Sequence, residues 1–176
     1  MRLFIAINFD EKTKEKLTAA VKTLKEFSSA GNFTRSENLH LTLVFIGETE
    51  NAAAAREAMA QVGGLPFELR MKGLGKFGRG GKDIYWLGVD RCAALEEIQK
   101  NLADNLRKRG FAIEQREYRP HLTLGREVVP LRDFDKEAYE KSFGTITQKV
   151  KSVDLMKSER ICGRLTYTKL FSIPLE

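Results

Sequence analysis

Residues 40–43 read His-Leu-Thr-Leu, and residues 121–124 repeat the same four residues. His40 and His121, which begin the two copies, are the only histidines in the chain. An extended strand directs successive side chains to opposite faces, so each copy predicts a strand with His and Thr on one face and two Leu on the other. We therefore expect two strands of the same kind, each with a polar pair backed by an apolar pair.

The apolar face of the first copy extends beyond the tetrapeptide. Strict alternation places four residues on it: Leu39, Leu41, Leu43 and Phe45. This run predicts that the strand rests on a hydrophobic core and presents its polar face elsewhere. Imidazole titrates near neutral pH, so two histidines on such faces can serve one reaction as acid and base.

The composition indicates a protein with enough apolar residues for a core and an excess of basic residues. Its 176 residues are 42% hydrophobic, and this size fits one domain or two small lobes. The net charge of +6 favours a polyanionic partner, although many basic soluble proteins bind no nucleic acid.

The sequence shows no sign of export or of a membrane span. Cys92 and Cys162 are far apart in the chain, which argues against a disulfide framework or a zinc knuckle and favours a cytoplasmic setting. The apolar run at residues 3–7 is too short for a signal peptide. No stretch reaches the roughly 20 apolar residues that a membrane span needs.

Hydrophobic periodicity predicts helices and strands along the whole chain. Helices are expected at residues 11–27, 51–61 and 93–109. Besides the two motif strands, strands are expected at residues 2–9, 67–71, 84–89, 146–156 and 165–173. The connecting segments are a turn at Gly31 and Asn32, a mobile loop at residues 76–82 and a polar connection at residues 129–144.

The order of these elements suggests an internal duplication. A helix, a motif strand and further strands occur twice, and the two motifs begin 81 positions apart, from His40 to His121. Two similar lobes that face each other across a groove would bring the two His-Thr pairs together. No obvious linker separates the lobes, so we expect one compact unit.

Other kinds of site are less well supported. Zinc needs three or four protein ligands, and the chain has no third histidine and no carboxylate at a ligand-like spacing from either motif. The phosphate-binding pattern G-x-x-x-x-G-K-[ST] is absent, and residues 78–81 fit a flexible turn. Nothing marks a serine or cysteine as an activated nucleophile.

The motifs and their flanks resemble a known family. Residues 37–43 read Glu-Asn-Leu-His-Leu-Thr-Leu and precede Phe-Ile-Gly at 45–47, while residues 119–126 read Arg-Pro-His-Leu-Thr-Leu-Gly-Arg. These segments resemble the 2H phosphoesterase superfamily, and within it the RNA 2′,3′-cyclic phosphodiesterases, also named 2′-5′ RNA ligases. Residues 2–7 and 85–89 are similar to family segments as well, so the resemblance covers most of the chain.

The resemblance implies a fold and a reaction. The fold is a bilobal α+β domain over residues 1–176, with two pseudo-symmetric lobes, each an antiparallel sheet with outer helices, around a central cleft. In the reaction, water opens the cyclic phosphate at an RNA 3′ end and leaves a 2′-phosphate. His40 is then the proton donor to the departing 3′ oxygen, and His121 is the proton acceptor that activates the water.

The two threonines and one arginine extend this site. Thr42 and Thr123 lie on the faces of their histidines and can donate hydrogen bonds to phosphate oxygens, although ordinary β-propensity also explains them. Arg126 matches an arginine that follows the second motif in relatives and could pair with phosphate. Alternation, however, places Arg126 on the leucine face unless the strand ends or bulges at Gly125.

Two further residues are candidate substrate contacts. Phe77 resembles a family position near the nucleoside pocket and could stack on a base, or it could be a core or loop-anchoring aromatic residue. Arg119 shares the His121 face by alternation and could contact phosphate. Three further cations of the glycine-rich loop are expected to provide general electrostatic attraction: Lys76, Arg79 and Lys82.

Three functions remain open at this stage. The leading one is hydrolysis of RNA ends or nucleotides that carry a 2′,3′-cyclic phosphate, with tRNA fragments one candidate substrate, by a monomer without metal or other cofactor. The second is 2′-5′ ligation or 2′-5′ phosphodiester cleavage by the same site. The third is a nucleotide- or RNA-binding module without turnover, which the intact His and Thr of both motifs disfavour.

Overall fold

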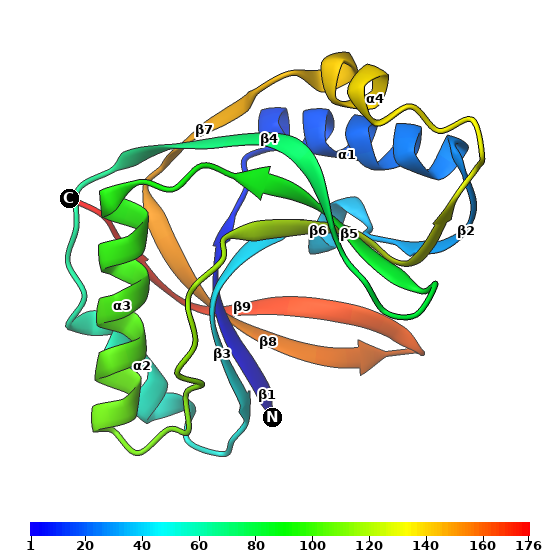
Figure 1. The fold of residues 1–176 in the computed structure, drawn as a ribbon. Helices are drawn as coiled ribbons and strands as arrows, with labels where there is room; N and C mark the ends of the chain where they lie inside the picture. The colour runs from blue at the N-terminus through cyan, green and yellow to red at the C-terminus, as the bar shows by residue number, and fades with distance from the viewer.

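Two antiparallel β-sheets form the centre of the molecule in the computed structural model, which describes residues 1–176 (Figure 1). The first-motif sheet has the order β3-β1-β8-β9, with bounds His40–Glu48, Arg2–Asn8, Ser152–Ile161 and Arg164–Pro174. The second-motif sheet has the order β2-β6-β5-β4-β7, with bounds Ser28–Phe33, His121–Pro130, Asp83–Val89, Phe67–Phe77 and Ile146–Val150. Each sheet thus contains one copy of the motif, at the start of a strand.

The two sheets are related in their strand order but differ at one edge. In both, the motif strand is followed by three antiparallel strands: β1, β8 and β9 after β3, and β5, β4 and β7 after β6. Strand β2 has no counterpart and pairs with the other side of β6. Consequently β3 is an edge strand, whereas β6 is paired on both sides.

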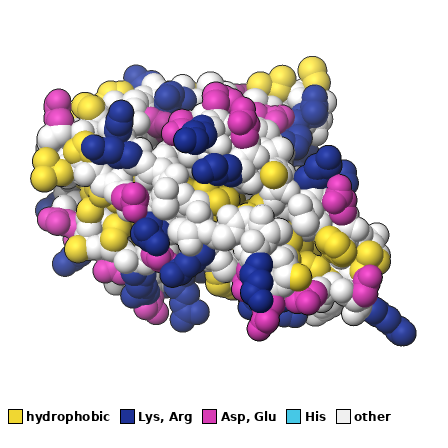
Figure 2. All heavy atoms as spheres, turned by 90° about the horizontal axis from the view of Figure 1, so that it is seen from above, with side chains coloured by type: hydrophobic (Ala, Val, Ile, Leu, Met, Phe, Trp, Pro, Cys, Tyr) yellow, Lys and Arg dark blue, Asp and Glu magenta, His cyan; other side chains and the backbone are white.

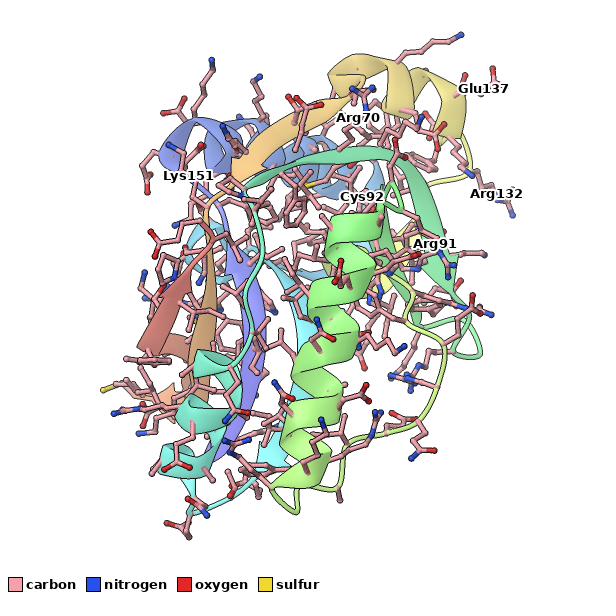
Figure 3. The ribbon with its side chains drawn as sticks, turned by 90° about the vertical axis from the view of Figure 1, so that its left-hand side faces the viewer. Arg70, Arg91, Cys92, Arg132, Glu137 and Lys151 are labelled. Atoms are coloured by element: carbon pink, nitrogen blue, oxygen red, sulfur yellow. The ribbon has the colours of Figure 1, made fainter.

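Two helices cover one face of each sheet (Figure 1). Helices α2 (Ala52–Ala60) and α3 (Ala93–Lys108) lie against the first-motif sheet, and α1 (Glu11–Glu26) and α4 (Lys136–Phe143) lie against the second-motif sheet. Figure 3 shows α3 along the first-motif sheet, with Cys92 at its N-terminal end. The predicted α+β architecture with two antiparallel sheets and outer helices is therefore confirmed.

Helix α1 illustrates why the long helices were predictable. The carboxylate of Asp10 accepts a hydrogen bond of 2.7 Å from the amide of Thr13, which satisfies one of the free amides at the helix start. Leu17, Val21 and Leu24 recur at helical spacing and are buried. The N-cap and the apolar periodicity thus indicate the same helix, which ends within one residue of the predicted boundary.

The leucines of both motifs belong to one hydrophobic cluster that includes residues of both sheets and of α1, α2 and α3. Leu41, Leu43, Leu122 and Leu124 are each at most 3% exposed. The prediction of core-facing leucines is confirmed, and the histidine and threonine of each motif lie on the opposite face of their strand.

Phe45 departs from the predicted alternation. The register of β3 against β1 shifts within residues 42–44, because the strand contains a β-bulge. Leu43 and Val44 are consequently both buried, and Phe45 comes to the face that carries His40, where it is 51% exposed. The prediction that Phe45 faces the core was wrong because the strict alternation of side chains between the two faces does not continue past a bulge.

The predicted turn at Gly31 and Asn32 was also wrong. Both residues belong to β2, which pairs with β6. The segment Ser28–Phe33 has no apolar alternation, and its central residues are exposed because β2 lies at the edge of its sheet. Pairing with β6 therefore overrides a composition that is typical of a turn.

Three other predicted boundaries were wrong. Residues 146–156 form parts of two strands, β7 and β8, which belong to different sheets on either side of Lys151. The predicted polar connection at residues 129–144 contains the end of β6 and helix α4, in which only Tyr139 is buried. Strand β4 continues to Phe77, so the predicted loop shortens to residues 78–82.

Two general features of the molecule concern membrane spans and surface charge. No helix is long and apolar enough to cross a membrane. On the face shown in Figure 2, Lys and Arg side chains alternate with Asp and Glu, and no histidine is visible. The basic excess is therefore not concentrated on that face.

Candidate active site

Both ring nitrogens of His40 lie next to polar atoms. Nδ1 lies 2.7 Å from the carbonyl oxygen of Asn38, and Nε2 lies 3.0 Å from the hydroxyl oxygen of Thr42. Because a carbonyl oxygen only accepts, Nδ1 carries the hydrogen, and in the neutral ring Nε2 accepts from the Thr42 hydroxyl. Burial lowers the pKa of His40, the Asn38 bond partly offsets this, and the charge of Arg126 lowers the pKa further.

Two aromatic residues enclose the His40 ring. Phe4 from β1 lies 5.0 Å from it, and Tyr167 from β9 lies 5.1 Å away, edge to face. Burial raises the pKa of Tyr167, while the charges of Arg126 and Arg2 act in the opposite direction. Neither aromatic residue could be predicted as part of the site, because each occupies an ordinary position in an apolar or alternating strand.

His121 occupies the equivalent position at the start of β6. Its Nδ1 lies 2.7 Å from the carbonyl oxygen of Arg119, so this nitrogen also carries the hydrogen and Nε2 is left for proton transfer. No protein group hydrogen-bonds to that Nε2. The ring of Phe77 lies edge to face at 5.0 Å, and the ring of Trp86 lies at 6.0 Å.

Trp86 forms a wall beside His121 and requires a glycine opposite. Trp86 pairs with Thr123 across β5 and β6 and with Gly75 across β4 and β5. A Cβ atom at Gly75 would lie 2.1 Å from the indole ring, so no other residue fits there without moving the ring. The indole Nε1 is buried without a hydrogen-bond partner.

Arg126 reaches the site through a bulge in β6. The register of β6 against β5 shifts between Thr123 and Gly125, so Leu124 and Gly125 are both buried and Arg126 comes to the face of His121. The charge of Arg126 lowers the pKa of both His40 and Tyr167, so the guanidinium lies near both. The simple alternation that placed Arg126 on the leucine face therefore does not hold, because the strand bulges at Leu124 and Gly125.

The two motifs meet where β3 and β6 come into contact. The hydroxyl of Tyr118 donates a hydrogen bond of 2.9 Å to the carbonyl oxygen of Thr42, so the segment before the second motif is fastened to the first. On the other side, the hydroxyl of Thr34 donates to the carbonyl oxygen of Thr123 at 2.8 Å. Together with Arg126, these bonds bring the two histidine strands to one junction.

The side chain of Arg119 has a different environment from the one expected. It is 73% exposed and lies 3.7 Å from Glu117, so its contact with His121 is made by the main-chain carbonyl. The side chain of Thr123 is half-buried and forms no hydrogen bond within the protein. Phe77, by contrast, lies beside His121 as a substrate contact of that site would.

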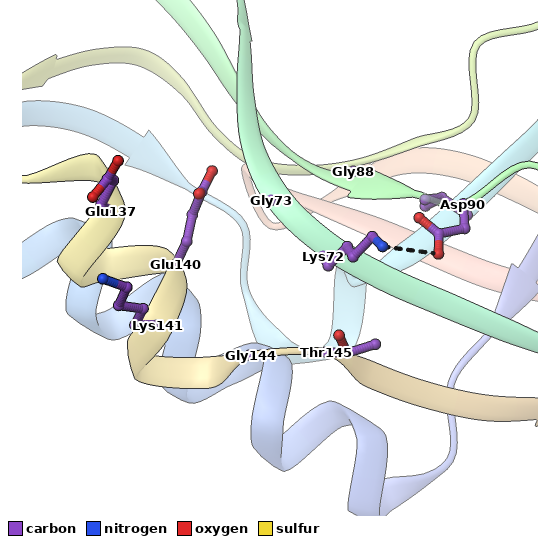
Figure 4. A pocket seen from close by; sticks show the side chains of 10 residues that line it. Lys72, Gly73, Gly88, Asp90, Glu137, Glu140, Lys141, Gly144 and Thr145 are labelled. Atoms are coloured by element: carbon purple, nitrogen blue, oxygen red, sulfur yellow. Dashed lines mark ion pairs between the residues drawn. The ribbon is translucent and has the colours of Figure 1, made fainter.

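A cavity of about 800 Å³ is lined by residues of β4, β5 and α4 and the segments next to them, and by none from either motif. Figure 4 shows an ion pair between Lys72 and Asp90 in it, 3.5 Å long, opposite the α4 side chains Glu137, Glu140 and Lys141. No three His, Cys, Asp or Glu side chains in residues 1–176 are grouped so that they could hold a metal ion.

A pair of antiparallel sheets with outer helices and one H-x-T-x strand each is the fold of the 2H phosphoesterases. Among solved structures, the apo form of LigT from E. coli has a TM-score of 0.81 and 25% identity, covering 99% of this chain and 96% of LigT. A crystal structure described as a phosphoesterase has a TM-score of 0.81 and 24% identity, with 99% and 97% covered.

Sequence comparisons identify the family. The family described as the 2′-5′ RNA ligase superfamily matches residues 13–161. An RNA 2′,3′-cyclic phosphodiesterase of Archaeoglobus fulgidus is 33% identical, over 82% of this chain and 84% of its own. One of Methanothermobacter thermautotrophicus is 32% identical, over 97% of this chain and 96% of its own. The chain therefore belongs to the 2′-5′ RNA ligase superfamily of 2H phosphoesterases, as its motifs predicted.

Proposed function

We propose that this chain is an RNA 2′,3′-cyclic phosphodiesterase that opens the cyclic phosphate with water and leaves a 2′-phosphomonoester. The observation that carries the proposal is the matched pair of imidazoles. In both His40 and His121 the Nδ1 atom is bonded to a main-chain carbonyl, so each ring offers Nε2 for proton transfer. Relatives that cover most of the chain are named as this enzyme.

The proposed step moves one proton at each histidine. His121 accepts a proton from water at Nε2 while the water oxygen forms a bond to phosphorus. The bond between phosphorus and the 3′ oxygen breaks, and His40 donates a proton from Nε2 to that oxygen. Solvent then restores the starting protonation of both rings.

The lowered pKa of His40 is compatible with a donor only when substrate is bound. In the free protein, burial and Arg126 favour the neutral ring. A bound phosphodiester brings a negative charge next to both groups, which offsets the charge of Arg126 and raises the pKa of His40. Binding of substrate would thus favour the protonated form of His40, whereas His40 in the empty site would remain mostly neutral.

Thr42, Thr123 and Arg126 are proposed to bind the phosphate. Negative charge increases on the non-bridging oxygens as water attacks, and two hydroxyl donors with a guanidinium stabilise it. The Thr42 hydroxyl, 3.0 Å from Nε2 of His40, would turn toward an oxygen of the phosphate when substrate enters. Phe77, beside His121, is proposed to stack on the terminal base.

No metal is required in this scheme, because two protonatable rings and a cation supply the acid, the base and the charge stabilisation. We also propose that residues 1–176 act as one bilobal unit, as a cytoplasmic monomer. RNA 3′ ends, tRNA fragments among them, are the proposed substrates. The family name favours one alternative, 2′-5′ ligation, in which an RNA 5′-hydroxyl replaces water at His121.

Hydrolysis of 2′,3′-cyclic AMP in excess chelator tests this proposal. Phosphorus NMR should identify the product as the 2′-phosphate, because the 3′ oxygen leaves. A 3′-phosphate product would reverse the assigned leaving group, and activity that depends on an added divalent metal would contradict the metal-free scheme. Adding an RNA with a 5′-hydroxyl to the same reaction measures ligation against hydrolysis.

A further inference from the structure

An aromatic surface extends from His40 along the same face of the first-motif sheet. The ring of Phe4 lies 5.0 Å from that of His40 and 6.5 Å from that of Phe45. The Phe4 and Phe45 rings are nearly parallel, at 11°. Phe4 is 2% exposed and Phe45 is 51% exposed. The row of rings that begins at His40, the candidate proton donor, therefore continues through the buried Phe4 to Phe45, which is open to solvent.

Arg2 lies over the exposed ring. Its guanidinium carbon is 5.0 Å from the centroid of Phe45, and its charge also acts on Tyr167 beside His40. Neither Arg2 nor Arg126 has a carboxylate within ion-pair distance. Two uncompensated cations thus lie near the site, and only Arg126 has a role in the proposed reaction.

The exposure of Phe45 results from the bulge in β3. Regular alternation would have buried this side chain beside Leu43, and an exposed phenylalanine gives up the free energy of burial. Bulges commonly redirect a side chain next to a functional site. An exposed aromatic ring with an unpaired arginine above it is the combination that binds single-stranded nucleic acid, through base stacking and phosphate attraction.

We propose that Phe45 and Arg2 bind the nucleotide on the 5′ side of the cyclic-phosphate end of an RNA strand. Arg2, which lies over the Phe45 ring in the free protein, moves off it to pair with the phosphodiester, and the base stacks on the ring face that Arg2 leaves. The inference rests on the proposed function, which places the terminal phosphate between His40 and His121. With the terminal base on Phe77, the strand would pass from the second-motif sheet to the first.

The test compares two substrates in each variant. One is 2′,3′-cyclic AMP, and the other is a short oligoadenylate that ends in a 2′,3′-cyclic phosphate. We expect Phe45→Ala to lower the ratio of kcat/KM for the oligonucleotide to that for the mononucleotide by about tenfold, because one stacked base is lost. Phe45→Tyr should retain the ratio. Arg2→Gln should lower it and weaken its salt dependence.

Matched controls are available elsewhere on the surface. Phe27 is 42% exposed and packs on Phe134, and Arg56 lies exposed on α2, so Phe27→Ala and Arg56→Ala should keep the wild-type ratio. Equal losses on both substrates, or no loss in Phe45→Ala, would overturn the proposal.

A binding measurement separates this inference from the proposed reaction. If the wild-type protein hydrolyses neither substrate, the proposed function fails. Fluorescence anisotropy of a labelled oligoadenylate with His121→Ala protein still tests the surface, because no turnover is needed. A Kd that rises about tenfold on adding Phe45→Ala supports the surface, and an unchanged Kd rejects it.

Discussion

The hydroxyl of Tyr118 donates a 2.9 Å hydrogen bond to the carbonyl oxygen of Thr42, and so fastens the segment before one histidine motif to the strand of the other. The bond is partly buried, so it is only partly open to competition from water. We expect this bond to help position the two imidazoles relative to each other, so its removal should affect turnover more than removal of a bond of the same kind elsewhere.

Tyr118→Phe should reduce kcat by about tenfold, if loosening the contact costs the transition state about 1.4 kcal/mol. Tyr139→Phe is the control, because the Tyr139 hydroxyl donates a bond of the same kind, 2.8 Å long, to the carbonyl oxygen of Ala20 and has no link to either motif. Thermal unfolding should show similar losses of stability in both variants. Equal kcat values would reduce Tyr118 to a purely structural residue.

His40→Ala and His121→Ala should each lower kcat/KM for 2′,3′-cyclic AMP by a factor on the order of 10² to 10⁴, since each removes one proton-transfer group. Circular dichroism should show that both variants fold. Steady-state kinetics in chelator provides the measurement, and substantial activity in either variant would falsify the two-histidine mechanism.

The pKa of His40 should lie below that of an ordinary histidine. The NMR signal of His40 should titrate at correspondingly low pH, because burial and Arg126 disfavour its protonated form. Arg126→Gln should raise the pKa of His40, since a neighbouring positive charge is removed. Inorganic phosphate should also raise the pKa of His40 in the wild-type protein, because a bound anion stabilises the protonated ring. Arg56→Gln serves as the control, and a His40 pKa unaffected by Arg126→Gln would place that guanidinium away from the ring.

Gly75→Ala should displace the indole of Trp86, because the new Cβ would lie 2.1 Å from the ring. We expect a loss of about 1–3 kcal/mol in the free energy of unfolding, typical of overpacking, and a lower kcat through the contacts of Trp86 with Phe77 and His121. Trp86 is the only tryptophan, so its fluorescence reports the displacement directly. Gly63→Ala, where a Cβ meets nothing within 4 Å, should leave emission and stability unchanged.

Much of the fold follows from local periodicity in the sequence. The long helices and both motif strands combine strong caps or apolar repeats with burial, so local and tertiary preferences agree. Strand β2 and helix α4 were missed because they are short and mostly exposed, and their pairing or packing partners, not their own residues, determine their structure. The break at Lys151 was missed because alternation continues while the strand changes sheets.

The candidate site also combines features that the local sequence predicts with features that depend on tertiary partners. Identical tetrapeptides predicted two polar faces, and in the structure the strands that carry them are in contact. The identical tetrapeptides do not distinguish the two histidines. His40 is enclosed by Phe4 and Tyr167, whereas His121 lies beside Phe77. The environment comes from strands far away in the chain, and the two bulges that redirect Phe45 and Arg126 depend on pairing that a single strand cannot reveal.

The chain passes from one sheet to the other four times, between β1 and β2, β2 and β3, β3 and β4, and β7 and β8. Neither half of the sequence therefore contains a complete sheet. A gene cut between the motifs, in the segment before β4, would produce one fragment with β1 and β3 and another with β8 and β9, each lacking its partners. Such fragments should recover activity only when mixed, because each sheet needs strands from both of them.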